Sequence, residues 1–395
     1  MLSKLLKSDR AFIQITRRYS SILSRLELCP VLVSTNKDVY TNLALEHWLY
    51  KNSTFRDETE FRHDTNKRVF PKPIVLIWTD EPCVVIGRHQ NPWIESTLGI
   101  VDKANVKLAR RYSGGGCVYH DENNINISII GHRKTFEHRQ SNLKFLADVI
   151  ERKYNIKCNP TPRYDLVHEE TGRKVSGSAA KLGRQNCVHH FTLLVDTDMD
   201  ALHIAIRQNQ QPFIESNSTA SIRSEVINLK RLKASLDVNR VTSDLAFEYG
   251  KLYGGTGISS STNEDRVNCD EMDYNRFATI KEELESWKWL YGMTPRFKLR
   301  RSVALSVGEH GRSAQFTVGI NKGLFETIEI EGDLDCKTIE QGLHGLIGTK
   351  FNYREAMINV AGLLNKSGAA KPTASVGVEI VFITHLLQMI HESNF

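Results

Sequence analysis

The sequence predicts an α+β fold, in which a mainly antiparallel sheet flanked by helices is followed by a small C-terminal α+β domain. Short β-type runs succeed one another with no helical pattern between them, which favours antiparallel pairing over crossover helices. The chain has 395 residues, 40% of them hydrophobic and 25% charged, as in ordinary globular proteins. A single hydrophobic core rarely extends over a chain of this length, so more than one domain is expected. We therefore expect a larger domain over residues 29–262 and a smaller, accessory one over 263–395.

In the first of these domains, apolar residues at helical spacing predict helices, and short β-branched runs predict strands. The first helix spans 38–50, with Thr41 and Asn42 as possible caps. The mixed-charge stretch 51–72 lacks either period and ends at two prolines, so we expect a surface loop there. The remaining elements, in order, are strands at 74–78, 83–86, 116–119 and 125–130, a helix at 143–154, strands at 165–168, around 175 and at 191–195, and helices at 199–208 and 243–252.

A linker is expected at 254–262, where three glycines and a Ser/Thr run occur together. Such a composition permits the two domains to rotate relative to one another. Beyond the linker, the same patterns predict a compact α+β unit. Its elements are a helix at 274–287, strands within 297–307 and 315–331, and helices at 338–347 and 376–391.

The first 28 residues have a composition of their own. They carry a net charge of +4, which leaves +2 of the total +6 for the remainder. Richness in Arg, Lys, Ser and Leu without an uninterrupted apolar core is typical of a mitochondrial transit peptide and fits a secretory signal badly. Arg17-Arg18-Tyr19-Ser20 resembles a matrix-protease cleavage site. We therefore expect cleavage near Tyr19/Ser20 and a mature protein in the mitochondrial matrix; the alternative is a disordered basic tail.

Several classes of ligand are not expected. Past the leader, Lys and Arg do not cluster, which argues against nucleic acid, and no apolar stretch of about 18 residues indicates a membrane span. The seven cysteines are scattered without a C-x-x-C pair, so neither disulfides nor a thiolate zinc site is indicated. His189 and His190 are neighbours on an expected strand and point to opposite faces. We therefore expect no metal, and a monomer by default.

Two motifs point to a site for an acidic ligand. The first, Arg110-Arg111-Tyr112-Ser113-Gly114-Gly115-Gly116-Cys117-Val118-Tyr119-His120-Asp121, places two guanidinium groups before three glycines. Without Cβ atoms, successive N–H groups can approach one oxyanion, and an arginine supplies a matching charge. A flexible turn is the alternative. The second motif, Arg173-Lys174-Val175-Ser176-Gly177-Ser178-Ala179-Ala180, precedes the strand-like run from His189 to Val195.

Together these motifs resemble the lipoate-protein ligase and lipoyltransferase family. The resemblance also takes in the motif Asn42-Leu43-Ala44-Leu45-Glu46, the run from Val84 to Trp93 and the run from Trp287 to Phe297. The pieces occur in family order and cover almost the whole chain after the leader. The resemblance implies a catalytic domain similar to those of biotin and lipoate ligases.

The implied activity, with a mitochondrial leader, is that of a mitochondrial lipoyltransferase. Such an enzyme transfers a lipoyl group from lipoyl-adenylate, or from a lipoylated glycine-cleavage carrier protein, to a lysine of lipoyl domains in 2-oxo acid dehydrogenase acyltransferase subunits. The alternative is a complete lipoate-protein ligase that activates free lipoate itself. No tightly bound cofactor is implied, since lipoyl-adenylate is a substrate, and ATP and magnesium are needed only by the complete ligase.

The resemblance also assigns site residues. Lys174 is the expected catalytic residue, which would stabilise the charge that develops during amine attack. Arg111 would contact the nucleotide end of the ligand, and Arg110 is a helper or a member of a structural ion pair. The further substrate-binding residues are Gly114, Gly115, Gly116, Tyr119, Arg163, Thr192, Thr219 and Ala220.

Some of these residues have plainer alternatives. Tyr119 could be core packing, and Arg163 could pair with Asp165. The strand from Val84 to Ile86 would line an apolar slot for the dithiolane tail, and Asn124 and Asn126 would hold the turn between strands.

Cysteine chemistry and other functions remain as alternatives. Related transferases use a cysteine, but neither Cys117 nor Cys187 stands where the lipoyltransferase pattern needs one, and free cysteines are commonly buried. Biotin ligases have a glycine-rich motif with a different sequence from Arg110 to Gly116, which argues against a biotin ligase. A non-enzymatic module that only binds carrier domains predicts loss of a charged site residue, whereas Arg111 and Lys174 are both present.

Overall fold

The computed structural model describes most of the chain after the leader. The described residues are 30–55, 69–70, 72–98, 106–207, 213–253, 271–305, 312–332, 343–359, 384–385, 387–388 and 391. The expected leader and the expected linker lie outside these residues, as does most of the helices expected at 338–347 and 376–391. Within the described residues, no helix is long and apolar enough to cross a membrane.

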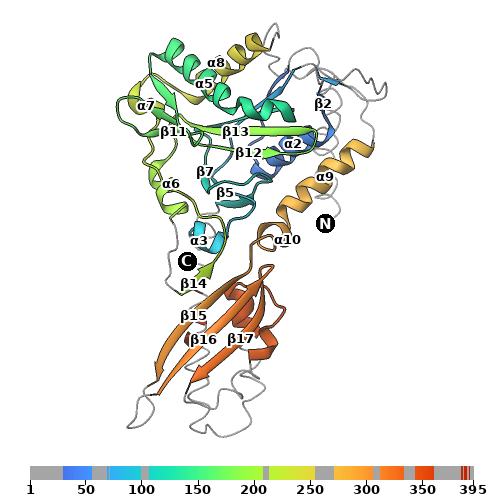
Figure 1. Cartoon of the computed structure of the whole chain (residues 1–395), viewed down its shortest axis with the longest axis vertical. Coiled ribbons are helices and arrows are strands. Elements are labelled where there is room, and N and C mark those ends of the chain that lie inside the picture. The colour runs from blue at the N-terminus through green and yellow to red at the C-terminus, as the bar shows by residue number, and fades with distance from the viewer. Residues whose placement is uncertain are drawn as a thin grey trace, which may run out of the picture.

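A five-stranded sheet forms the centre of the larger part of the molecule (Figure 1). Its strands run in the order β1-β4-β8-β13-β12, and all neighbours are antiparallel except β1 and β4. The mainly antiparallel sheet expected from the sequence is thereby confirmed. The bounds are β1 Val31–Val33, β4 Ile74–Trp78, β8 Asn124–His132, β12 Ser178–Leu182 and β13 Asn186–Leu194.

Helices cover both faces of this sheet. Along β4, Val75 and Ile77 pack against helices α5 (Arg139–Tyr154) and α8 (Val238–Leu252), whereas Leu76 packs on the opposite face against α2 (Val39–Asn52). This alternation follows from the two-residue period of a strand, and it explains why β4 reads as an unbroken apolar run. Figure 1 shows α5 and α8 together on one side of the sheet.

Four helices begin at residues other than those expected, one of them being α9 (Glu271–Glu285), which was expected from 274. Asp38, rather than Thr41 or Asn42, caps α2, because its side chain accepts a hydrogen bond from the Thr41 N–H. Helix α8 starts at Val238 behind the cap Asp237 instead of at 243, and α5 starts at Arg139 after a 3₁₀ turn, Arg133–His138, instead of at 143. The first turn of α5 is polar, so apolar periodicity does not reveal it, and the start of α8 is marked by its cap Asp237 rather than by an apolar run.

Two small sheets carry the motifs. One has the order β6-β5-β7 and comprises β6 Lys107–Arg110, β5 Cys83–Ile86 and β7 Val118–His120; the other has the order β11-β10-β9 and comprises β11 Lys174–Ser176, β10 Leu166–His168 and β9 Cys158–Pro160. The expected surface loop 51–72 is partly structured, because β2 Thr54–Phe55 pairs with β3 Val69–Phe70. The short helices are α3 Pro92–Glu95, α6 Met199–Ala205 and α7 Leu229–Leu232.

The smaller part contains a four-stranded antiparallel sheet, β14-β15-β16-β17, at the opposite end of the molecule from α5 and α8 (Figure 1). Its strands are β14 Ile214–Ser216, β15 Phe297–Leu305, β16 Arg312–Asn321 and β17 Leu324–Gly332, with a 3₁₀ turn, His344–Leu346, after them. A turn at Lys322 and Gly323, both with positive φ, divides the run expected at 315–331 into two strands.

Chain segments on either side of the expected linker pack across to the other part. Strand β14 precedes the linker but pairs with β15. Helices α9 Glu271–Glu285 and α10 Trp287–Leu290 follow the linker, and Phe277, Leu284 and Trp289 belong to the same apolar core as α2.

Candidate active site

The glycine-rich motif forms a loop between β6 and β7 that is built around Arg111. The guanidinium of Arg111 donates from Nη2 to the carbonyls of Gly114 and Gly116, both at 2.7 Å, from Nη1 to the carbonyl of Val85 at 3.1 Å, and from Nε to Ser113 Oγ at 3.0 Å. Burial lowers the pKa of Arg111 to about 10, so the side chain stays charged at neutral pH. Arg111 thus shapes the loop from within, and its expected contact with the nucleotide end of a ligand stays a prediction.

This arrangement turns backbone N–H groups away from Arg111. A trans peptide directs its C=O and N–H to opposite sides, so a Gly114 carbonyl that faces the guanidinium directs the Gly115 N–H outward. Gly115 has φ +89°, a conformation that favours glycine. Within the described residues, the N–H groups of Gly114, Gly115 and Gly116 have no acceptor. Several unpaired donors on one short loop form a concavity suited to an anion.

Gly87 allows the glycine loop to pack closely on β5. A Cβ atom at Gly87 would lie 2.1 Å from the Gly115 carbonyl oxygen, a distance that no side chain permits. The backbone N–H of Arg88 donates to the carbonyl of Ser113 at 2.8 Å, which ties the two segments together. A larger residue at 87 would therefore displace the loop.

The segment 219–221 lies against the same loop. Ser221 Oγ accepts hydrogen bonds from the Cys117 N–H at 2.8 Å and from Gln90 Nε2 at 2.9 Å, and the Thr219 N–H donates to the carbonyl of His89 at 3.1 Å. Thr219 and Ala220 are themselves exposed. The fold thus brings two expected ligand-binding residues next to the glycine loop from about 100 residues further along the chain.

Lys174 lies beside Gly177 of the second motif. Its ammonium pairs with Asp165 Oδ1 at 2.9 Å, and its side chain is 23% exposed. The end of the side chain passes so close to Gly177 that a Cβ there would lie 2.6 Å from Lys174 Cε. The hydroxyl of Thr192 accepts from the Gly177 N–H at 3.2 Å. Lys174 and Thr192, both expected site residues, therefore meet at Gly177.

The start of β12 connects this group to the glycine loop. Ala179 Cβ lies 3.3 Å from the position that a Cβ would take at Gly115. Two extended residues span at most about 7 Å, so Gly177 is close to the loop as well. Lys174, Thr192, the three glycines and the 219–221 segment thus form one region, which we call the candidate active site.

Tyr119 and Arg163, the other two expected ligand-binding residues, lie in the core and on the surface respectively. Tyr119 on β7 is 4% exposed and belongs to a core cluster with Val84 and Ile86, and burial raises its pKa to about 12. Arg163 is exposed in the turn before β10. Asp165, the partner suggested for Arg163, instead forms the ion pair with Lys174.

Arg110 is buried and pairs with no carboxylate of the described residues, so of its two expected roles the structural ion pair is not the one found. Its buried guanidinium donates to backbone carbonyls of two parts of the chain and to one hydroxyl. The acceptors are the carbonyls of Gly87, Arg88, Gln90 and Leu290 and Oγ1 of Thr294. Burial lowers the pKa of Arg110 to about 9. Arg110 thus connects the segment beside the glycine loop to the chain around α10.

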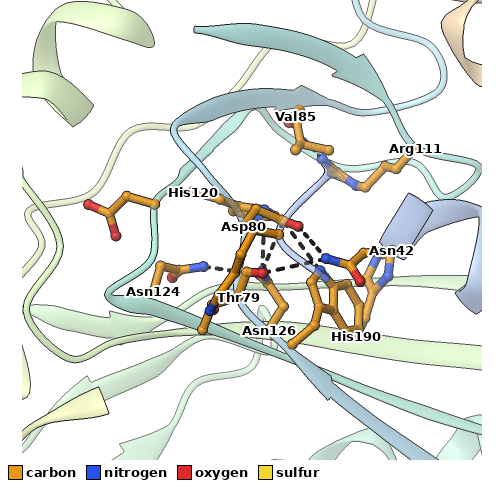
Figure 2. A network of polar contacts seen from close by, with 12 residues as sticks. Asn42, Thr79, Asp80, Val85, Arg111, His120, Asn124, Asn126 and His190 are labelled. Carbon is orange, nitrogen blue, oxygen red and sulfur yellow. Dashed lines mark hydrogen bonds and ion pairs between the residues drawn. The ribbon is translucent and has the colours of Figure 1, made fainter. Parts of the chain in front are cut away.

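A buried polar network supports the site from below (Figure 2). Asp80, fully buried after β4, accepts hydrogen bonds from Asn42 Nδ2 at 2.7 Å, from His120 Nδ1 at 2.9 Å and from Asn126 Nδ2 at 3.3 Å. Asn124 donates in turn to Asn126 at 3.0 Å. The network joins α2, β4, β7 and β8. Sequence reasoning missed Asp80, although an acidic residue directly after a buried apolar strand was a usable signal.

Asp80, His120 and Cys83 are also of metal-ligating types, and their ligand atoms lie within 4.8 Å of one another. However, both oxygens of Asp80 already accept N–H groups. Burial raises the pKa of the Cys83 thiol well above its usual value, which disfavours the thiolate that binds metals. The residues therefore suit a hydrogen-bonded support better than a metal centre.

The two cysteines considered as nucleophiles lie in environments that disfavour a thiolate. Burial raises the pKa of Cys117 to about 12 and raises that of Cys187 as well. Cys187 also donates to the His132 carbonyl at 3.3 Å. Neither thiol is activated in this structure.

Comparison with known proteins places this chain in a family of acyl-transferring enzymes. The model of the lipoyl protein ligase A/B catalytic domain matches residues 38–249, and the chain belongs to this family. It is 33% identical over 325 residues to the human protein named lipoyl amidotransferase LIPT1, mitochondrial, which covers 81% of this chain and 82% of that protein. It is 28% identical over 339 residues to lipoate-protein ligase A of Bdellovibrio bacteriovorus, with 84% and 92% covered.

A solved structure shares the fold. Plasmodium falciparum LipL1, determined in complex with lipoate, matches with a TM-score of 0.51 and 21% identity over 91% of this chain and 99% of that one. The chain is accordingly an enzyme, an acyltransferase that transfers lipoyl groups.

Proposed function

We propose that this protein is a lipoyltransferase of the mitochondrial matrix, which moves a lipoyl group onto a lysine of lipoyl domains in 2-oxo acid dehydrogenase acyltransferase subunits. The proposed donor is lipoyl-adenylate or a lipoylated glycine-cleavage carrier protein. The location is supported by the composition of residues 1–28 and by the mitochondrial location in the human relative's name.

One observation carries the proposal: the unpaired N–H groups of the glycine loop and the ammonium of Lys174 belong to one region. Acyl transfer from an adenylate to an amine develops negative charge on the carbonyl oxygen while a phosphate is already present. Fixed donors aimed at these oxygens lower the barrier without a covalent intermediate.

From lipoyl-adenylate, the proposed reaction is direct. The unprotonated ε-amine of the acceptor lysine attacks the lipoyl carbonyl carbon, the bond from that carbon to the adenylate oxygen breaks, and AMP leaves. The electron pair of the broken bond leaves with AMP, and the proton that the attacking nitrogen gives up as the amide forms passes to water. Asp165 holds Lys174 in place before the ligand enters, and the ligand's phosphate offers the ammonium a second anionic partner.

The mass of an unmodified lipoyl domain tests this function. The domain is incubated with the full chain in three reactions: with lipoyl-adenylate, with a lipoylated glycine-cleavage carrier protein, and with free lipoate, ATP and magnesium. We expect a mass gain with one or both preformed donors and none with free lipoate. A gain with free lipoate would instead show a complete ligase, and no gain in any reaction would refute lipoyl transfer.

A further inference from the structure

Three residues from three separate motifs form a hydrogen-bonded line behind the glycine loop. Ser113 Oγ lies 2.7 Å from His190 Nε2, and His190 Nδ1 lies 2.7 Å from Glu46 Oε2. Glu46 comes from α2, Ser113 from the glycine-rich motif, and His190 from β13, where it points toward the side of Arg111 (Figure 2). None of the three has a role in the function proposed above.

The partners determine how the protons are placed along this line. Burial pushes the pKa of Glu46 upward, but the charge of His190 and the hydrogen bonds from His190 and Ser128 outweigh it, so the pKa is lowered overall. Glu46 is therefore an ionised acceptor, and His190 Nδ1 is the donor toward it. Ser113 Oγ accepts from Arg111 Nε at 3.0 Å, and the same oxygen forms the contact with His190 Nε2, so Ser113 links Arg111 to His190.

The line is shielded from water. The side chains of His190 and Glu46 are 11% and 7% exposed, and Ser113 is 3% exposed. Hydrogen bonds in such surroundings are strong and specific, because water does not compete for the partners. The same burial argues against Ser113 as a nucleophile, although the geometry resembles a serine–histidine–carboxylate triad.

Ser113 is the residue at which the glycine loop begins. Its carbonyl accepts from the Arg88 N–H at 2.8 Å, and the next carbonyls along the loop accept from Arg111. The hydroxyl bond to His190 adds an anchor on β13, the strand that also carries Thr192. The orientation of the first loop peptide, and with it the outward Gly114 N–H, thus depends on an anchor that reaches Glu46.

We infer that Glu46, His190 and Ser113 are positioning residues of the transfer reaction, which hold the N–H groups of the glycine loop toward the oxygens of the acyl-adenylate. This inference rests on the proposed function. The substrate's contacts are made by the loop itself, and the three side chains act through it.

The test compares two serine-to-alanine variants of the full chain. Ser113→Ala removes the hydroxyl at the loop. Ser128→Ala is the matched control, since Ser128 also donates to Glu46, at the same oxygen Oε2 that His190 contacts, but does not touch the loop. For each variant we would measure the melting temperature, the kcat and KM of transfer from lipoyl-adenylate, the KM for the lipoyl domain, and the affinity for a non-hydrolysable lipoyl-sulfamoyl adenosine.

For Ser113→Ala we expect a roughly tenfold or greater loss in kcat/KM for the adenylate and a parallel loss of affinity for the sulfamoyl analogue, with the KM for the lipoyl domain unchanged. Ser128→Ala should stay within about twofold of the wild type in all of these. Glu46→Gln, whose amide oxygen can still accept from His190, should retain more activity than Glu46→Ala. Loss of the hydrogen-bond partner, rather than of the charge, would then explain the effect.

Three outcomes would overturn the inference. Ser113→Ala could match the wild type, or its loss could merely follow a lower melting temperature with the affinity for the analogue unchanged. The third outcome is an acyl adduct on Ser113 after the wild-type chain is incubated with lipoyl-adenylate in the absence of the lipoyl domain. Such an adduct would make Ser113 a nucleophile. If the wild-type chain transfers nothing, the proposed function fails, and this result is distinct from all three.

Discussion

Gly177→Ala is expected to inactivate the enzyme while leaving its fold intact. The added Cβ would lie 2.6 Å from Lys174 Cε and 2.7 Å from Lys174 Nζ. Ordinary contacts begin near about 3.4 Å, so the end of Lys174 must move by roughly 1 Å. A misplacement of this size costs on the order of 10²-fold in rate. Lys174 is a flexible, partly exposed side chain, and its ion pair with Asp165 contributes on the order of 1 kcal/mol. The melting temperature should therefore change by only about 2–4 °C.

The assay is initial-rate transfer from lipoyl-adenylate to a lipoyl domain, with the melting temperature measured on the same preparations. The matched variants are Lys174→Ala and the double variant Lys174→Ala/Gly177→Ala. If Gly177→Ala acts only through Lys174, the double variant should be no slower than Lys174→Ala alone. Wild-type activity in Gly177→Ala would refute the reasoning, because Lys174 would then not need its observed position. An additive further loss in the double variant would refute it too.

Three further predictions concern other parts of the structure. Gly87→Ala places a Cβ 2.1 Å from a backbone oxygen and should lower both the transfer rate and the free energy of unfolding, the latter by about 1–3 kcal/mol. Gly114→Ala, whose Cβ meets nothing within 4 Å, is the control in denaturant unfolding. Equal free energies of unfolding for the two variants would contradict this prediction. Cys117→Ser and Cys187→Ser should each retain transfer within about twofold, because burial raises the pKa of both thiols; loss of transfer in only one of them, at an unchanged melting temperature, would indicate a thioester. Asp38 is half-buried and pairs with Lys107 at 2.8 Å and Lys281 at 3.1 Å; burial raises the pKa of Asp38, but these partners outweigh it and the pKa is lowered overall. A carboxyl with a lowered pKa stabilises the fold above its unfolded pKa of about 4 and loses this contribution as the pH falls further. Asp38→Asn keeps a helix cap, so it should cost about 1–2 kcal/mol at pH 7 in urea unfolding and weaken the decline below pH 4; an unchanged pH dependence would contradict the assignment.

The strands of the core were predictable because their pattern is local. The runs at 74–78 and 83–86 match β4 and β5 in full, since fully buried strands read as short apolar runs between turn residues. The helix at 38–50 was likewise found to within two residues. Apolar periodicity missed the polar first turn of α5 at Arg139 and the start of α8 at Val238, which the cap Asp237 marks.

The motifs of the candidate active site were also readable in the sequence, but the direction of their side chains was not. Arg111 was expected to face a ligand, whereas in the structure it faces the carbonyls of its own loop. For Tyr119 the sequence left open ligand contact or core packing, and in the structure its ring lies in the core. A residue's type is compatible with either direction, and packing against distant elements decides between them.

The sequence by itself determined the family, the order of the motifs and the chemistry that the glycines and Lys174 make available, because each depends on residues close together along the chain. Only the tertiary structure decided the partners. Lys174 meets Asp165, which directly precedes the neighbouring strand β10; Ser113 meets His190 and through it Glu46; and Arg110 binds the carbonyl of Leu290, 180 residues away. Hydrogen bonds join whichever donors and acceptors the packed elements bring within 3 Å or so, and no local pattern specifies partners that lie so far apart in the chain.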